Sequence, residues 1–170
     1  MLREAIQLDE AGRYVEAADA YEEVLRINGA CVAARANLTV LYWQATELGF
    51  SAGHALPSEF IQRAADRLHF LLAGVGQEQL TGPEMQFWKM YISWADYGEP
   101  LPVERCLQLL ADYPAYLEPV LFVFGATEGS QYREEALELV QQCPREATVR
   151  NRYVESVLAS ALRQFPGKAN

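Results

Sequence analysis

The sequence lacks the long apolar runs that would carry a chain across a membrane. No stretch approaches the roughly 18 consecutive apolar residues of a membrane-spanning helix. The start of the chain, Met1–Glu4, has no charged leader with an apolar region behind it, so we expect no signal peptide. The three cysteines, Cys31, Cys106 and Cys143, form neither a CxxC pair nor a disulfide framework. The sequence therefore indicates reduced thiols and a cytoplasmic location.

Positive charge is scarce. The chain has 14 Lys and Arg against 23 Asp and Glu, which gives a formal net charge of −9. Nucleic acids and anionic membranes both attract basic surfaces, so this charge argues against either as the main partner. Histidine is scarcer still, because His54 and His69 are the only two. Neither accompanies a cysteine cluster or spaced carboxylates, so we expect no metal site and no cofactor.

Familiar catalytic motifs are missing as well. The sequence has no HExxH, GxSxG, GxGxxG or glycine-rich phosphate loop. A nucleophilic cysteine needs a positioned base, and neither histidine is adjacent to one, so we interpret the cysteines as structural. The carboxylates recur at helix-surface spacing with arginine partners, such as Glu22 with Arg26, which indicates a solvated face. We therefore expect that the chain is not an enzyme.

Apolar residues, in contrast, are abundant. They make up 51% of the chain, against 22% charged residues, and this balance excludes disorder for most of its length. A length of 170 residues suits a single domain. The apolar residues recur at steps of three and four, and no stretch alternates cleanly between apolar and polar. The pattern predicts an all-α protein.

Glycine and proline divide the periodic segments into about nine helices. Pro57, Pro83 and Pro102 stand where first helical turns would begin, a position that proline tolerates. Gly74–Gly76 is a further break, and we interpret Gly49–Leu56 as an inserted loop. The other connections are short, which forces consecutive helices to lie antiparallel. We therefore expect a stack of helical hairpins.

An internal repeat agrees with this arrangement. At a constant offset of 34 residues, Ala5, Leu8 and Gly12 align with Thr39, Tyr42 and Thr46. The segment Gly12–Asn28 resembles the second half of a tetratricopeptide repeat. That family has a glycine at the turn between the helices, a following aromatic residue and a small residue inside the second helix. Gly12, Tyr14 and Ala17 match these roles, since Gly12 permits a left-handed turn and Ala17 allows close helix approach.

The resemblance implies further repeats over residues 1–170, as one repeat domain. The segment from Asn37 looks like the first helix of a second repeat, Phe87–Pro114 resembles a third, and Pro119–Cys143 a degenerate fourth. Arg145–Phe165 is then expected to be a polar capping helix. Leu2–Ala11 is short for the first helix of a repeat. Either its N-terminal turn is missing or the chain is an excised part of a longer protein.

The aromatic residues gather in two segments that the repeat alignment places one above the other. Those interpreted as core are Tyr42, Phe87, Tyr91 and Trp94. Trp43 and Trp88 are each adjacent to a core position and therefore lie about 100° around the helix from it. We expect both to point toward the concave face that such repeats use for partners, where exposed tryptophan is typical of binding hot spots.

The resemblance also indicates groove residues. In peptide-binding members of the family, an asparagine on the first helix of the second repeat contacts the ligand backbone, and nearby basic residues hold a terminal carboxylate. Asn37 matches the asparagine and Lys89 one basic position, but Ile6, Leu2 and Met85 occupy other positions of this clamp. We therefore expect apolar anchoring rather than a carboxylate clamp. The expected partner-binding residues are Asn37, Val40, Trp43, Met85, Trp88, Lys89 and Ile92.

The sequence thus predicts a non-enzymatic protein–protein interaction module, an adaptor, scaffold or chaperone that binds a peptide or partner helix in a concave groove. Its length and acidity are similar to those of the small tetratricopeptide chaperones of type III secretion. Two other classes stay open. An acidic immunity protein would neutralise a basic toxin, and folding could assemble a catalytic or ligand-binding site around Cys31, His54 or His69.

Overall fold

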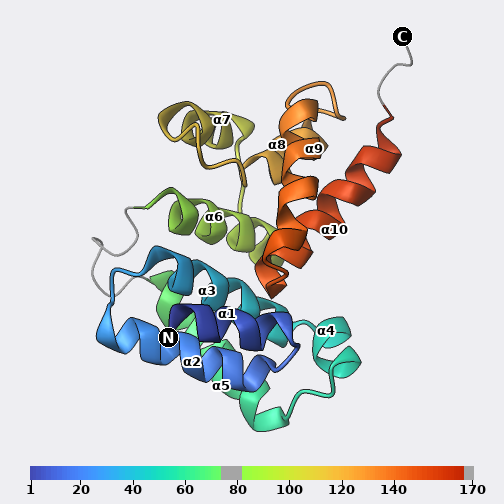
Figure 1. Cartoon of the computed structure of the whole chain (residues 1–170). Helices are drawn as coiled ribbons and strands as arrows, with labels where there is room; N and C mark the ends of the chain where they lie inside the picture. Colours follow the sequence, from blue (N-terminus) through green and yellow to red (C-terminus); the bar gives the residue numbers. More distant parts are fainter. Residues whose placement is uncertain (74–81, 167–170) are drawn as a thin grey trace. The chain divides into compact units, whose positions relative to one another are not determined.

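The computed structural model describes residues 1–73 and 82–166 (Figure 1), so the expected break at Gly74–Gly76 lies outside the described residues. Within these ranges all regular structure is helical and no strand occurs, which confirms the all-α prediction. None of the described helices is both long and apolar enough to cross a membrane. The described residues form ten α-helices, which are α1 (Leu2–Glu10), α2 (Tyr14–Ile27), α3 (Val32–Thr46), α4 (Leu48–Gly53), α5 (Ser58–Ala73), α6 (Pro83–Tyr97), α7 (Val103–Asp112), α8 (Val120–Ala126), α9 (Arg133–Gln142) and α10 (Val149–Gln164).

Most helix boundaries follow the glycine and proline pattern. Helix α6 begins at Pro83, and α5 and α7 begin directly after Pro57 and Pro102. Gly12 has a φ of +75° in the turn between α1 and α2, which confirms the left-handed turn expected there. The prediction of an inserted loop at Gly49–Leu56 was partly wrong, because the first residues of this segment belong to helix α4. Helix α4 has six residues, too few to show a period of apolar residues.

The described chain divides into two compact units. The first consists of residues 1–89 with 148–150, and the second of residues 90–147 with those from 151 onward. Helices α6 and α10 each contribute residues to both. The expectation of one continuous repeat domain stays a prediction.

In the first unit, α3 is the central helix. Helix α2 packs against α1 and α3, and α3 packs against α5 (Figure 1). Every residue from Ala34 to Trp43 is buried, so α3 has no solvent-facing side over that stretch. Ala5, Ala17 and Ala18 are completely buried where α1 and α2 meet. Their small side chains let the two helix backbones approach closely, as expected for Ala17.

A buried polar network lies inside the first unit. The Tyr21 hydroxyl donates to Asp9 Oδ2 at 3.2 Å and accepts a hydrogen bond from Asn37 Nδ2 at 3.2 Å. Asp9 Oδ1 accepts from the backbone N–H of Val149 at 2.9 Å. Asp9 and Tyr21 are both completely buried. Because an unmet buried polar group is costly, the loss of any one of the three side chains would leave a buried group without a partner.

The second unit has its own core. Helix α8 packs against α7 and α9, and the fully buried side chains include Val120, Val123, Phe124 and Leu158. Gly129 follows α8 with a φ of +73°, and a Cβ there would lie 2.7 Å from Phe165 Cβ. Only glycine fits this close approach without strain.

Candidate functional site

The two tryptophans expected at an exposed partner surface are buried. Trp43 is 3% exposed and Trp88 is completely buried. The alignment correctly brought them together, because their ring centroids lie 6.3 Å apart. The expected exposure was wrong, since it assumed that the first helix of each repeat leaves one face open, and α3 has no open face over Ala34–Trp43. Trp94, expected in the core, is instead 40% exposed.

Of the other expected partner-binding residues, all but Lys89 are buried. Val40, Met85 and Ile92 are buried, and Met85 Sδ lies 3.8 Å from Thr39 Oγ1. Lys89 is exposed. Asn37 is 6% exposed and donates its amide to Tyr21, so this amide serves the interior of the first unit. A role of these residues in partner binding stays a prediction, but the burial of all of them except Lys89 removes the reason for preferring them.

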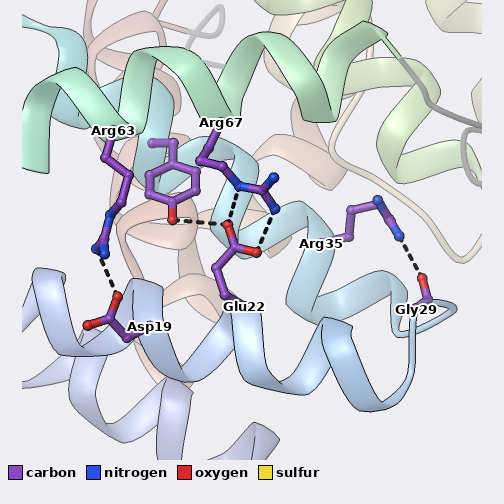
Figure 2. Close-up of polar contacts among 7 residues, drawn as sticks. Asp19, Glu22, Gly29, Arg35, Arg63 and Arg67 are labelled. Carbon is purple, nitrogen blue, oxygen red and sulfur yellow. Dashed lines mark hydrogen bonds and ion pairs between the residues drawn. The ribbon is translucent and has the colours of Figure 1, made fainter.

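A different part of the first unit is open. A groove with a volume of about 650 Å³ lies along α2, α3 and α5. Figure 2 shows polar contacts among residues that line it. Pockets of this size hold several side chains or a small ligand. The groove is lined by Asp19, Glu22, Glu23, Leu25, Arg26, Gly29, Arg35, Tyr42, Arg63, Arg67, Phe70 and Leu71.

Helical spacing places the charged groups opposite one another. Arg63 and Arg67 are four residues apart, and Asp19 and Glu22 three apart, so each pair occupies one face of its helix. In Figure 2 both arginines reach from α5 toward the two carboxylates on α2. Arg63 Nη2 lies 2.8 Å from Asp19 Oδ1. The two helices are therefore tied together across the groove.

Glu22 is the most connected of these groups. Its Oε1 accepts from Arg67 Nε at 2.8 Å and from the Tyr42 hydroxyl at 3.1 Å, and its Oε2 accepts from Arg67 Nη2 at 2.7 Å. The expected pair of Glu22 with Arg26 is wrong, because Arg26 binds Glu23 at 2.6 Å. Arg67 and Arg26 each form a two-point contact with their carboxylate, the arrangement that gives the strong charge-assisted pairs.

Burial and the charge of Glu22 shift the pKa values of Tyr42 and Arg67. Burial, with the Glu22 carboxylate nearby, raises the pKa of Tyr42 well above its usual range. The Tyr42 hydroxyl therefore keeps its proton and donates a hydrogen bond to Glu22. The hydrogen bond with Glu22 raises the pKa of the Arg67 guanidinium. At neutral pH this cluster consists of a fixed ion pair and a neutral phenol, an arrangement that holds charge in place.

Arg35 differs from the other arginines of the groove. It is 8% exposed, and its Nη2 donates to the backbone carbonyl of Gly29 at 2.6 Å (Figure 2). No carboxylate of the described residues forms an ion pair with it. Burial lowers the pKa of its guanidinium, although Glu22 at longer range opposes the effect. An arginine stays charged under these conditions, so the groove contains a cation without a matching anion.

The groove also has an apolar side. Phe70 is 43% exposed, and the Arg67 guanidinium lies 4.9 Å from the centre of its ring. Leu25 and Leu71 line the groove beside it. A large exposed ring next to a fixed cation suits a ligand that combines an apolar side chain with a negative charge.

The histidines and cysteines remain apart from this groove. His54 and His69 are exposed, and the centre of the His54 ring lies 4.9 Å from that of the Tyr14 ring. No disulfide joins the three cysteines in the part of the chain that the structure describes, and burial raises the pKa of the Cys106 thiol to about 11. Within that same part, no three His, Cys, Asp or Glu side chains lie close enough to hold a metal ion.

Sequence reasoning missed the groove because its ion pairs join distant segments. Glu22 and Arg67 are 45 residues apart in the chain, so no local spacing predicts their contact. One signal was present. Arg35 is the single charged residue of α3, a helix that is otherwise nearly apolar. Since charged side chains are seldom buried without a specific contact, that position indicated a special environment.

No protein-family model, no curated protein and no solved structure matches the chain.

Proposed function

We propose that the chain is a non-enzymatic protein–protein interaction module that binds a segment of another protein in the groove of α2, α3 and α5. The observation that carries the proposal is Arg35, a buried cation that lines an open groove and has no ion pair among the described residues. Phe70 adds exposed apolar area beside it. A charged centre with an apolar neighbour is a common composition for a protein-binding site.

The proposal includes a tetratricopeptide-like stack of helical hairpins. The contacts of α1 with α2 and of α3 with α5, with α2 against α3, support it. So does the left-handed Gly12 at the first turn. In such stacks the first helix of each pair lines the usual groove. Here the second helices, α2 and α5, supply most of the groove lining, and the largely buried α3 contributes only Arg35 and Tyr42. The cytoplasmic location expected from the sequence stays part of the proposal.

Photo-crosslinking at two matched positions tests the function. A photoreactive phenylalanine derivative replaces Phe70 in one variant and Leu137 in the other, because these side chains are 43% and 42% exposed. Leu137 lies on α9, which contributes nothing to the groove. After irradiation in cells of the source organism, we expect adducts of discrete mass from position 70 and none from position 137. Equal labelling at both positions, or none at position 70, would contradict the proposal.

A further inference from the structure

The groove of α2, α3 and α5 holds one more positive charge than negative. Its lining contains four arginines and three carboxylates, and each carboxylate has an arginine within 3 Å. The ion pairs are Arg26–Glu23, Arg63–Asp19 and Arg67–Glu22. Arg35 remains as the unmatched cation among the described residues. In a chain whose net charge is −9, a groove with a surplus cation is unusual.

We propose that the groove binds an acidic segment of the partner protein, an inference that rests on the proposed function. One Asp or Glu carboxylate of that segment binds the Arg35 guanidinium, and an apolar side chain next to it packs on Phe70. The carboxylate supplies the single negative charge that the lining lacks.

The geometry of Arg35 suits a carboxylate. A guanidinium has five N–H donors, and in the described structure that of Arg35 makes one hydrogen bond, to Gly29 O. That bond fixes the orientation of the guanidinium plane, so little side-chain entropy is lost on binding. The remaining donors can engage both oxygens of a carboxylate. Such charge-assisted pairs are the strong ones where water is partly excluded.

The surplus of one charge favours a carboxylate over a phosphate polyanion. A nucleic acid or a phosphate cluster would bring several negative charges against Asp19, Glu22 and Glu23. Those carboxylates already form ion pairs with the other three arginines. Nucleic-acid binding also requires a broad basic surface, which a chain of net charge −9 does not favour. A short acidic peptide meets neither obstacle.

The net negative charge of the chain does not prevent binding of an acidic segment. At physiological salt the Debye length is about 8 Å, so distant surface carboxylates are largely screened. A contact with Arg35 is short and partly shielded from water, and is screened much less. Repulsion therefore slows the encounter more than it weakens the bound state.

The test uses fluorescein-labelled synthetic peptides and fluorescence anisotropy with the full chain. Each peptide carries a Phe or Leu at varied spacing from an Asp or Glu, and matched peptides replace the acid with Asn, Gln or Lys. We expect the acidic peptides to bind and their amide and lysine versions to bind at least about tenfold more weakly, which corresponds to roughly 1.4 kcal/mol. Binding of the lysine peptides, or of no acidic peptide below about 1 mM, overturns the inference.

Three variants locate the binding. Arg35→Gln removes the surplus charge and should weaken acidic-peptide binding about tenfold or more. Arg105→Gln removes the same charge from an exposed position on α7, outside the groove, and should leave binding unchanged. Phe70→Ser alters an exposed side chain, so it tests the groove even if Arg35→Gln unfolds. Equal losses for Arg35→Gln and Arg105→Gln, or unchanged binding in Phe70→Ser, overturn the inference.

The failure of this inference and that of the proposed function give different results. If position 70 crosslinks to a partner segment that contains no Asp or Glu, the interaction module stands and the acidic occupant is wrong. If position 70 does not crosslink at all, the proposed function fails. A single-stranded oligonucleotide that binds the wild type and not Arg35→Gln would also overturn the acidic peptide as occupant.

Discussion

The carboxylate of Asp9 accepts a hydrogen bond from the backbone N–H of Val149, 140 residues further along the chain. Val149 is the first residue of α10, where backbone N–H groups lack partners within the helix. A negative charge at this end of a helix is also favoured by the helix dipole. Asp9 binds the Tyr21 hydroxyl with its other oxygen, so one buried side chain connects α1, α2 and the start of α10.

Asp9→Ala should therefore destabilise the protein strongly. It leaves the Val149 N–H and the Tyr21 hydroxyl without an acceptor in a buried site, at a cost of about 2–4 kcal/mol. Asp9→Asn keeps one acceptor oxygen and should cost less. Urea unfolding followed by circular dichroism measures both. Glu4→Ala, which removes an exposed carboxylate from the same helix, should cost under about 1 kcal/mol. Equal stability of Asp9→Ala and Glu4→Ala would contradict the network.

Trp88 should act on stability rather than as an exposed binding anchor. Because it is completely buried, Trp88→Ala should destabilise by about 3–5 kcal/mol. Trp94 is 40% exposed and packs its ring 5.1 Å from that of Phe122, so Trp94→Ala should cost clearly less. Thermal unfolding of the two variants gives the comparison. A larger loss for Trp94→Ala would show that the two environments are assigned the wrong way round.

The sequence predicted the secondary structure better than it predicted which side chains are buried and which are exposed. The apolar period identified the helices, and Gly12 marked the first turn, because both signals are local. The side of a helix that faces solvent depends on how many neighbours cover it. The apolar residues of α3 lie on all sides of the helix, which is typical of a buried helix. The assumption of an open first-helix face therefore placed Trp43 and Trp88 wrongly.

The groove could not be predicted from local sequence patterns, because its contacts also depend on how the helices pack. Glu22 has Arg26 one helical turn away, and spacing alone favours that pair. In the structure Arg26 pairs with Glu23, and Glu22 pairs with Arg67, which lies on α5 and is distant in the chain. Only the position of Arg35 within an apolar helix was visible in the sequence.

Gly129 should tolerate no side chain. Its φ of +73° strains any other residue, and an added Cβ would lie 2.7 Å from Phe165 Cβ and 3.2 Å from Phe124 Cζ. Gly129→Ala should therefore destabilise by about 1–3 kcal/mol. Gly125→Ala is the matched control, because this glycine lies in α8 with nothing within 4 Å of an added Cβ. It should be neutral or stabilising in urea unfolding, by up to about 1 kcal/mol. Loss of stability in the control alone would refute the assigned turn.

Cys106 should make the protein less stable at alkaline pH. Burial raises the pKa of its thiol from 9.0 to about 11, although Arg105 opposes the effect. The folded state therefore holds the proton more tightly than the unfolded state. This contribution to stability is fully present below pH 9 and is lost as the pH rises toward 11, with a slope of at most about 1.4 kcal/mol per pH unit. Tyr21 and Tyr91, whose pKa values burial also raises, add their own loss above pH 10.

A comparison with Cys106→Ala isolates the thiol, because the variant retains the tyrosines. Urea unfolding under reducing conditions gives the free energy of unfolding of both proteins from pH 7 to 11. We expect the substitution to cost a constant amount below pH 9, since the cavity left by the smaller side chain does not titrate. Between pH 9 and 11 the wild type should lose stability faster than the variant, so the difference should shrink. Curves that stay parallel across this window would mean that the Cys106 thiol titrates alike in the folded and unfolded states, contrary to its burial in α7.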